Sequence, residues 1–106
     1  MAKYMIHGSY TATGAAGVLK DGGAGRLKAI TDLAASVGGS VESAYWALGP
    51  EDFYIVVELP DSKAAAAVSL ATAGSGAVRL STAEVFSASD VDEIVSRRAT
   101  YRPPGA

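Results

Sequence analysis

The alternation of apolar and polar residues predicts a first β-strand over residues 3–11. Within it, Tyr4 and Ile6 fall on one face and Met5 and His7 on the other, because successive side chains of a strand point to opposite sides. Aromatic and β-branched residues are frequent here, which favours an extended backbone. The first predicted element is therefore a strand with two different faces.

Three more strands are predicted over residues 40–48, 53–59 and 77–86. The run at 53–59 is apolar on both faces until Glu58, which is typical of a central strand. The preceding residues 49–52 predict a turn in which proline fixes φ and Asp52 hydrogen-bonds nearby amides. Pro60 ends the strand.

The first helix is expected in two pieces. Thr11 or Thr13 caps a short helical segment that runs through residue 20. The glycine-rich segment 21–25 then interrupts or kinks it. Apolar residues recur at three- and four-residue spacing over 25–37, so this second piece is the stronger helix.

Two further helices are predicted. Asp61 caps the first of these, and an alanine-rich run extends it to about residue 73. The cluster 87–90 opens a last short helix. Its apolar residues are expected to face inward: Val91, Ile94 and Val95.

The resulting order is β-α-β-β-α-β followed by a helix. With right-handed crossovers, this order gives an α+β, ferredoxin-like sheet with both main helices on one face. Residues 1–98 are expected to form a single domain, because two halves of this chain would be too small to bury separate cores. The proline-rich segment 99–106 is expected to be an extended C-terminal tail.

The other face of such a sheet has no helix to cover it. Met5, Tyr54 and Val56 are predicted to lie there. An exposed apolar sheet face needs a partner. We therefore expect the protein itself to be that partner, in a homodimer or higher oligomer whose sheets pack face to face around an internal cavity.

Composition excludes several classes of function. The 106 residues carry 9 Lys and Arg against 11 Asp and Glu, a net charge of −2, and no cysteine. Without a dense basic face, nucleic acid is not an expected partner. No apolar stretch reaches the length of a membrane span and no signal peptide is apparent, so no membrane association is expected. A cytoplasmic, bacterial-type protein is the default prediction.

Several sequence blocks, spread in order over nearly the whole chain, resemble the bacterial GYD-domain family. The blocks are residues 3–4 and 8–11, 14–23, 38–39, 44–49, 57–61, 75–79 and 101–105. One position departs from the family pattern: the Gly-x-Tyr-Asp signature would place tyrosine at position 51, where this chain has Glu51. The effect of this replacement is open, although Gly49 and Asp52 are kept.

The resemblance implies a fold and little function. The family is similar in size and element order to the dimeric α/β-barrel superfamily, which agrees with the predicted ferredoxin-like dimer. It brings no established activity or catalytic residue. Similar dimeric barrels use a buried histidine, with Tyr or Trp neighbours, to bind haem or to orient a phenolic substrate. No cofactor is predicted here, with haem at His7 as an open alternative.

Four side chains are candidates for a ligand-binding site: His7, Trp46, Tyr54 and Glu58. His7 is the single histidine, so a multi-histidine metal site is excluded and no metal is expected. If the strand parities hold, all four line one pocket and supply an acid/base and stacking set. The alternatives are a histidine satisfied within the sheet interior, and a Glu58 that reaches solvent or pairs with Arg79.

Three functions stay open at this point. The first is a homo-oligomeric module that binds or senses a small, partly apolar molecule. The second is a cofactor-independent monooxygenase or isomerase, with His7 or Glu58 as the catalytic base. The third is a structural assembly or partner-binding subunit whose cavity is packed solid. The sequence does not decide whether the protein is an enzyme.

Overall fold

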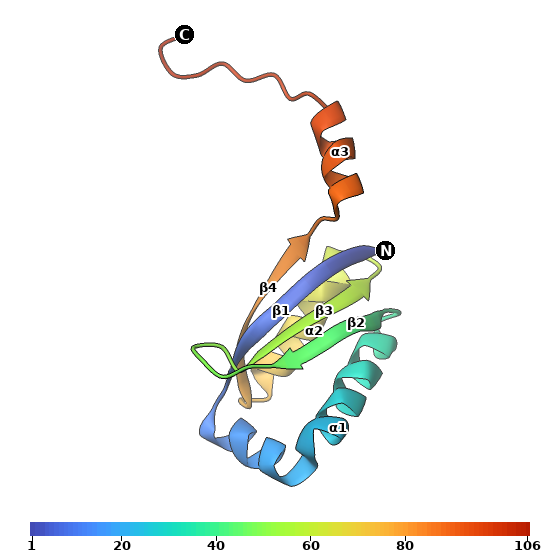
Figure 1. Cartoon of the computed structure of the whole chain (residues 1–106), viewed down its shortest axis with the longest axis vertical. Coiled ribbons are helices and arrows are strands. Elements are labelled where there is room, and N and C mark those ends of the chain that lie inside the picture. Colours follow the sequence, from blue (N-terminus) through green and yellow to red (C-terminus); the bar gives the residue numbers. More distant parts are fainter.

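The computed structural model describes all 106 residues and shows an α+β fold (Figure 1). In chain order, the elements are β1 (Ala2–Tyr10), α1 (Ala12–Ser36), β2 (Ser40–Trp46), β3 (Phe53–Leu59), α2 (Ser62–Gly74), β4 (Val78–Val85) and α3 (Ala88–Ser96). The predicted order of elements is confirmed, and β3 has the predicted bounds. None of the helices combines the length and apolarity needed to cross a bilayer.

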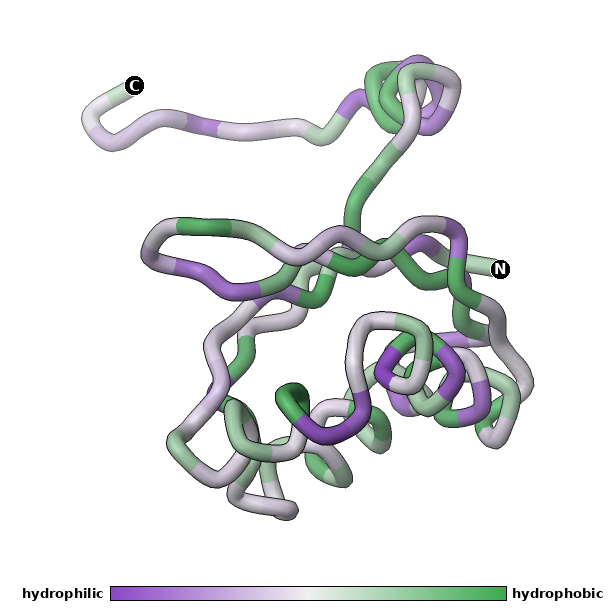
Figure 2. Tube along the Cα trace, turned by 60° about the horizontal axis from the view of Figure 1, so that its bottom comes forward, coloured by the Kyte–Doolittle hydropathy of each residue, from purple (hydrophilic) through white to green (hydrophobic).

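The four strands form one sheet in the order β2-β3-β1-β4. Every neighbouring pair is antiparallel. α1 and α2 both line the cavity beneath one face of this sheet, and Figure 2 shows these two helices gathered on that side of the strands. The predicted arrangement of both main helices on one face is therefore confirmed. Neither main helix covers the opposite face, and α3 lies on that side past the end of β4, where it lines a depression together with Lys3.

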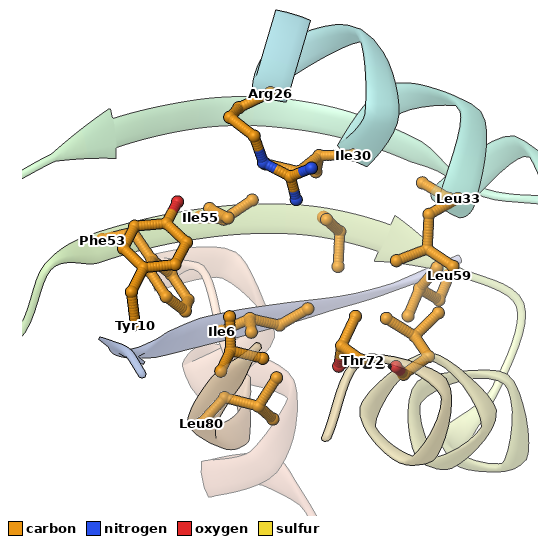
Figure 3. Close-up of a pocket in the computed structure, with 14 residues that line it drawn as sticks. Ile6, Tyr10, Arg26, Ile30, Leu33, Phe53, Ile55, Leu59, Thr72 and Leu80 are labelled. Carbon is orange, nitrogen blue, oxygen red and sulfur yellow. Dashed lines mark hydrogen bonds between the residues drawn. The ribbon is translucent and has the colours of Figure 1, made fainter. Parts of the chain in front are cut away.

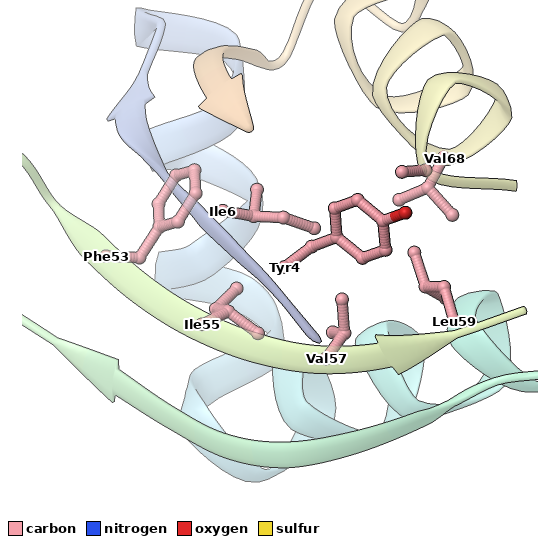
Figure 4. Close-up of a cluster of buried hydrophobic side chains, with 8 residues drawn as sticks. Tyr4, Ile6, Phe53, Ile55, Val57, Leu59 and Val68 are labelled. Carbon is pink, nitrogen blue, oxygen red and sulfur yellow. The ribbon is translucent and has the colours of Figure 1, made fainter. Parts of the chain in front are cut away.

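The core lies between the sheet and the helices (Figure 4). Its eight buried residues are Tyr4, Ile6, Phe53, Ile55, Val57, Leu59, Ala65 and Val68. They come from alternate positions of β1 and β3 and from one side of α2, as the period of two along a strand requires. Ile30 and Leu33 of α1 pack against this cluster. The two central strands thus hold the fold together.

α1 bends at the predicted place. The side chain of Thr11 accepts a hydrogen bond from the Gly14 amide and caps the helix. Gly22 has φ 70° and ψ 177°, which glycine adopts without the steric cost of a side chain. The predicted kink in 21–25 is therefore confirmed, and beyond it the helix reaches the strands, where Ala34 is buried.

The expectation that the apolar residues of α3 face inward is wrong. Val91, Ile94 and Val95 are 47%, 46% and 52% exposed. The covered face of the sheet is already occupied by α1 and α2, and α3 projects past the end of β4 (Figure 1). Ser87 nevertheless caps it, and the Ser87 amide donates to the Asp90 carboxylate and lowers the pKa of that carboxyl.

Two glycine-to-alanine variants test the close contact between β1 and β4. A Cβ on Gly8 would overlap the backbone carbonyl of Arg79, which cannot move without disturbing the strand pair. Gly8→Ala is expected to lower the free energy of unfolding by about 1–3 kcal/mol. Gly17→Ala is the control, because a Cβ there meets nothing within 4 Å and helix propensity favours alanine. Equal midpoints for both variants in chemical denaturation would contradict this.

Candidate functional site

The uncovered face of the sheet, called here the open face, carries a mixed apolar and polar surface. The strand pairing places Met5 beside Val56 and His7 beside Tyr54 on it. Ser81 lies beside His7 on the other flank, in β4. The predicted placement of Met5, Tyr54 and Val56 on the uncovered face is therefore confirmed. The imidazole of His7 and the ring of Tyr54 lie 6.1 Å apart between centroids and 18° from coplanar.

Trp46 does not share this face, so the expectation that all four candidate side chains line one pocket is wrong. The pairing of β2 with β3 shifts register between Val41 and Ser43, which is a β-bulge or similar irregularity. An extra residue reverses the side to which every later side chain points. Trp46 therefore pairs with the buried Phe53, and its Nε1 donates to the Tyr10 hydroxyl at 2.9 Å.

Glu58 does lie on the open face, but at its far end from His7. It pairs across strands with Lys3, which is four residues from His7, or about 13 Å along the strand. The Lys3 Nζ lies 4.0 Å from Glu58 and 2.6 Å from Glu42, and the Glu42 carboxylate raises the pKa of Lys3. Glu58 thus faces Lys3, and the alternative pairing with Arg79 is not found.

His7 is held by a carboxylate that sequence reasoning did not connect with it. Its Nδ1 lies 2.9 Å from Oε1 of Glu51, and both side chains are about one-third exposed, at 30% and 31%. With a carboxylate as partner, the proton of a neutral imidazole belongs on Nδ1 and the lone pair on Nε2. This pair can therefore accept a proton at Nε2, the atom that Glu51 leaves free.

The turn that carries Glu51 is fastened to the end of β1. The Asp52 amide donates to the Gly8 carbonyl at 2.7 Å, and the Tyr10 amide donates to the Asp52 carboxylate at 2.9 Å. The Ser9 hydroxyl donates to the Pro50 carbonyl at 3.0 Å. The predicted role of Asp52 as an acceptor for amides is confirmed. These bonds position Glu51 beside His7.

A polar depression of about 300 Å³ opens between this turn, β1 and β4. Its lining includes His7, Ser9, Pro50, Glu51, Arg79 and Ser81. It contains only one hydrophobic residue among eight. No group of three or more His, Cys, Asp or Glu side chains is placed to hold a metal ion. Hydrogen bonding and proton transfer are the chemistry that this lining supports.

A second cavity, of about 60 Å³, lies inside the core between the helices and the sheet (Figure 3). Twelve of its fourteen lining residues are hydrophobic. Arg26 extends its side chain over it, with a buried Nε that has no hydrogen-bond partner and an Nη1 3.7 Å from Asp21. An apolar cavity that binds benzene has a volume of about 150 Å³, and this cavity is less than half that size. This space is therefore a packing void of the core.

Two residues of the open face were missed by the sequence interpretation. Tyr45, 70% exposed, lies beside Tyr54 because the shift in β2 moves it to this side. No glycine or proline marks the shift, so the sequence held no signal for it. The sequence did contain a signal that Glu51 could be a functional residue. It stands in a strand-connecting turn, at a position singled out by its departure from the family signature.

The GYD domain matches residues 4–95 of the 106-residue chain. The chain belongs to the GYD domain family. No curated protein and no solved structure matches it. In this GYD domain, the position of the signature tyrosine is therefore the position that supplies a carboxylate to His7.

The protonation pattern of His7 tests this pair directly, because the chain has a single histidine and its imidazole signals need no assignment. With Glu51 as the acceptor, the neutral ring is expected to carry its proton on Nδ1. Glu51→Ala should shift the ring toward the Nε2–H form that predominates in free histidine. Nitrogen-15 chemical shifts of the imidazole distinguish the two.

Glu42→Ala is the matched control, because it removes a carboxylate at the opposite end of the open face. It should leave the imidazole spectrum unchanged. An Nε2–H ring in the wild-type protein would show that Glu51 does not orient His7.

Proposed function

We propose that the protein is a homo-oligomeric module that binds or senses a small, partly apolar molecule on its open face. One observation carries the proposal: a sheet face that neither main helix covers, and that is apolar in its middle, ends in the polar depression beside His7 and Glu51. Ligand sites combine apolar walls with a few polar groups in this way. Met5, Val56 and Tyr54 supply the apolar part.

The surface of the single chain supports the oligomer. It exposes 7061 Å², whereas a compact monomer of 10.7 kDa exposes about 5,500 Å². The excess of about 1,500 Å² includes the open face together with α3 and the C-terminal segment, and it exceeds the roughly 800 Å² that each partner buries in a standard interface. The radius of gyration, 16.7 Å, exceeds the approximately 13 Å of a compact chain of this length because α3 and the C-terminal segment project beyond the sheet (Figure 1).

Sheet-to-sheet packing is the arrangement that we propose for the oligomer. The strand order and the two helices on one face fit a ferredoxin-like fold, and two such sheets facing each other form a dimeric α/β barrel. The polar depressions then lie inside the assembly, at the ends of the shared apolar layer. The exposed apolar residues of α3 add surface that a second copy would cover.

Light scattering on the purified protein tests this arrangement. The wild-type chain is expected at twice the chain mass, and Val56→Glu is expected to be monomeric because it places a charge in the centre of the apolar layer. Leu19→Glu is the matched control, since Leu19 is 89% exposed on α1, away from the open face. A wild-type monomer, or a Val56→Glu dimer, would contradict the proposal.

A second candidate function is catalytic, and the contact between His7 and Glu51 favours it. In a cofactor-independent monooxygenase or isomerase, Nε2 of His7 would remove a proton from a phenol or from a carbon next to a carbonyl group. Glu51 would orient the imidazole and stabilise the imidazolium that forms. Glu58 is the weaker choice as base, because Lys3 lies beside it.

Turnover of an activated phenol or lactone distinguishes catalysis from binding. If His7 is the base, His7→Ala should lower kcat by about 100-fold or more while the dimer persists. Glu58→Gln should retain activity. Unchanged turnover in His7→Ala removes His7 from the mechanism, and absence of turnover in the wild-type protein leaves the binding function.

No cofactor is predicted, and haem at His7 stays the open alternative that the family resemblance implies. His7 would hold the iron through the imidazole nitrogen that Glu51 leaves free, and Met5 and Val56 would supply one apolar wall. The opposite wall would have to come from a second copy. An absorbance spectrum of the purified protein decides the matter, because bound haem gives an intense Soret band.

A further inference from the structure

We propose that the depression beside His7 binds the carboxylate of the ligand, and that Arg79 is the residue that recognises it. This inference rests on the proposed binding function and names the chemical class of the molecule bound. Arg79 opens onto the depression from β4, where it lies opposite Ser9. It is two residues from Ser81, the cross-strand neighbour of His7, so both flank the same space.

Some polar groups of the depression already have partners within the chain, and one does not. The Glu51 carboxylate is engaged by His7, and the Ser9 hydroxyl donates to the Pro50 carbonyl. Arg79 forms neither an ion pair within 4.0 Å nor a side-chain hydrogen bond. A guanidinium has five N–H donors and no acceptor. Arg79 is exposed in the single chain, so water hydrates its guanidinium, and no residue of the chain supplies a negatively charged acceptor.

Packing of the open face against a second copy would remove this water. A guanidinium that loses water in an interface needs a counter-charge, because an unpaired buried charge is costly. The one carboxylate of its own chain in this depression, Glu51, is already bound to His7. A ligand carboxylate meets the guanidinium with two parallel hydrogen bonds.

Charge favours a carboxylate over a phosphate. Arg79 contributes one positive charge, which a single carboxylate balances. A phosphate dianion would bring a second negative charge next to Glu51. The rest of the ligand would extend over Tyr54 and Met5, which lie on the same face toward its apolar centre. The expected ligand is thus a small carboxylic acid with an apolar or aromatic body.

The experiment is a titration followed by the imidazole signals of His7, with three probes: benzoate, its neutral analogue benzamide, and inorganic phosphate. Benzoate is expected to shift the signals saturably, and benzamide and phosphate to bind at least several-fold more weakly. Arg79→Gln is expected to weaken benzoate binding by about tenfold or more. Arg79→Lys should bind with intermediate affinity, because the charge remains but the two parallel hydrogen bonds do not.

Arg102→Gln is the matched control, since it makes the same change in the C-terminal tail, and it should bind benzoate like the wild type. Equal affinity for benzoate and benzamide, or an unchanged affinity in Arg79→Gln, overturns the inference. Light scattering on the same samples separates this failure from that of the proposed function. A dimer that binds benzamide as well as benzoate would support the homo-oligomeric binding module but contradict recognition of a carboxylate. A monomer that binds no probe would contradict both.

Discussion

Both crossover helices lie on one face of the sheet, and the exposure of the opposite face follows from that placement. Because β1 and β3 are central, their inward side chains supply most of the core while their outward side chains have no cover in the chain. The molecule is therefore well packed on one side only. Only 11 of 106 residues are buried in the single chain.

The candidate site depends on how the β2–β3 turn is fastened. Backbone and side-chain hydrogen bonds to the end of β1 leave this turn little freedom, and they bring Glu51 against His7. His7 and Glu51 therefore lie beside the apolar residues Met5 and Val56 of the open face and do not separate them. The same arrangement leaves Arg79, on the neighbouring strand, without a partner from its own chain.

The site was less predictable than the fold. The face of His7 and Tyr54 followed from the alternation along β1 and β3, which have regular pairing. The face of Trp46 did not, because one irregularity in β2 reverses the alternation beyond it. Glu58 was placed on the correct face, but its separation from His7 depends on the register of two strands. The alternation along one strand predicts which face of the sheet a side chain lies on. It does not predict which residues of other strands lie next to it.

The sequence by itself determined the order of the elements, the bounds of β3, the kink at Gly22 and the uncovered sheet face. Each of these depends on residues close together in the chain: a period of two, a cap, a glycine or a proline. The tertiary structure alone decided the contact between His7 and Glu51, the removal of Trp46 to the covered face, and the outward position of α3. These join residues far apart in the chain, or depend on which surfaces other elements already occupy, so local physical preferences cannot specify them.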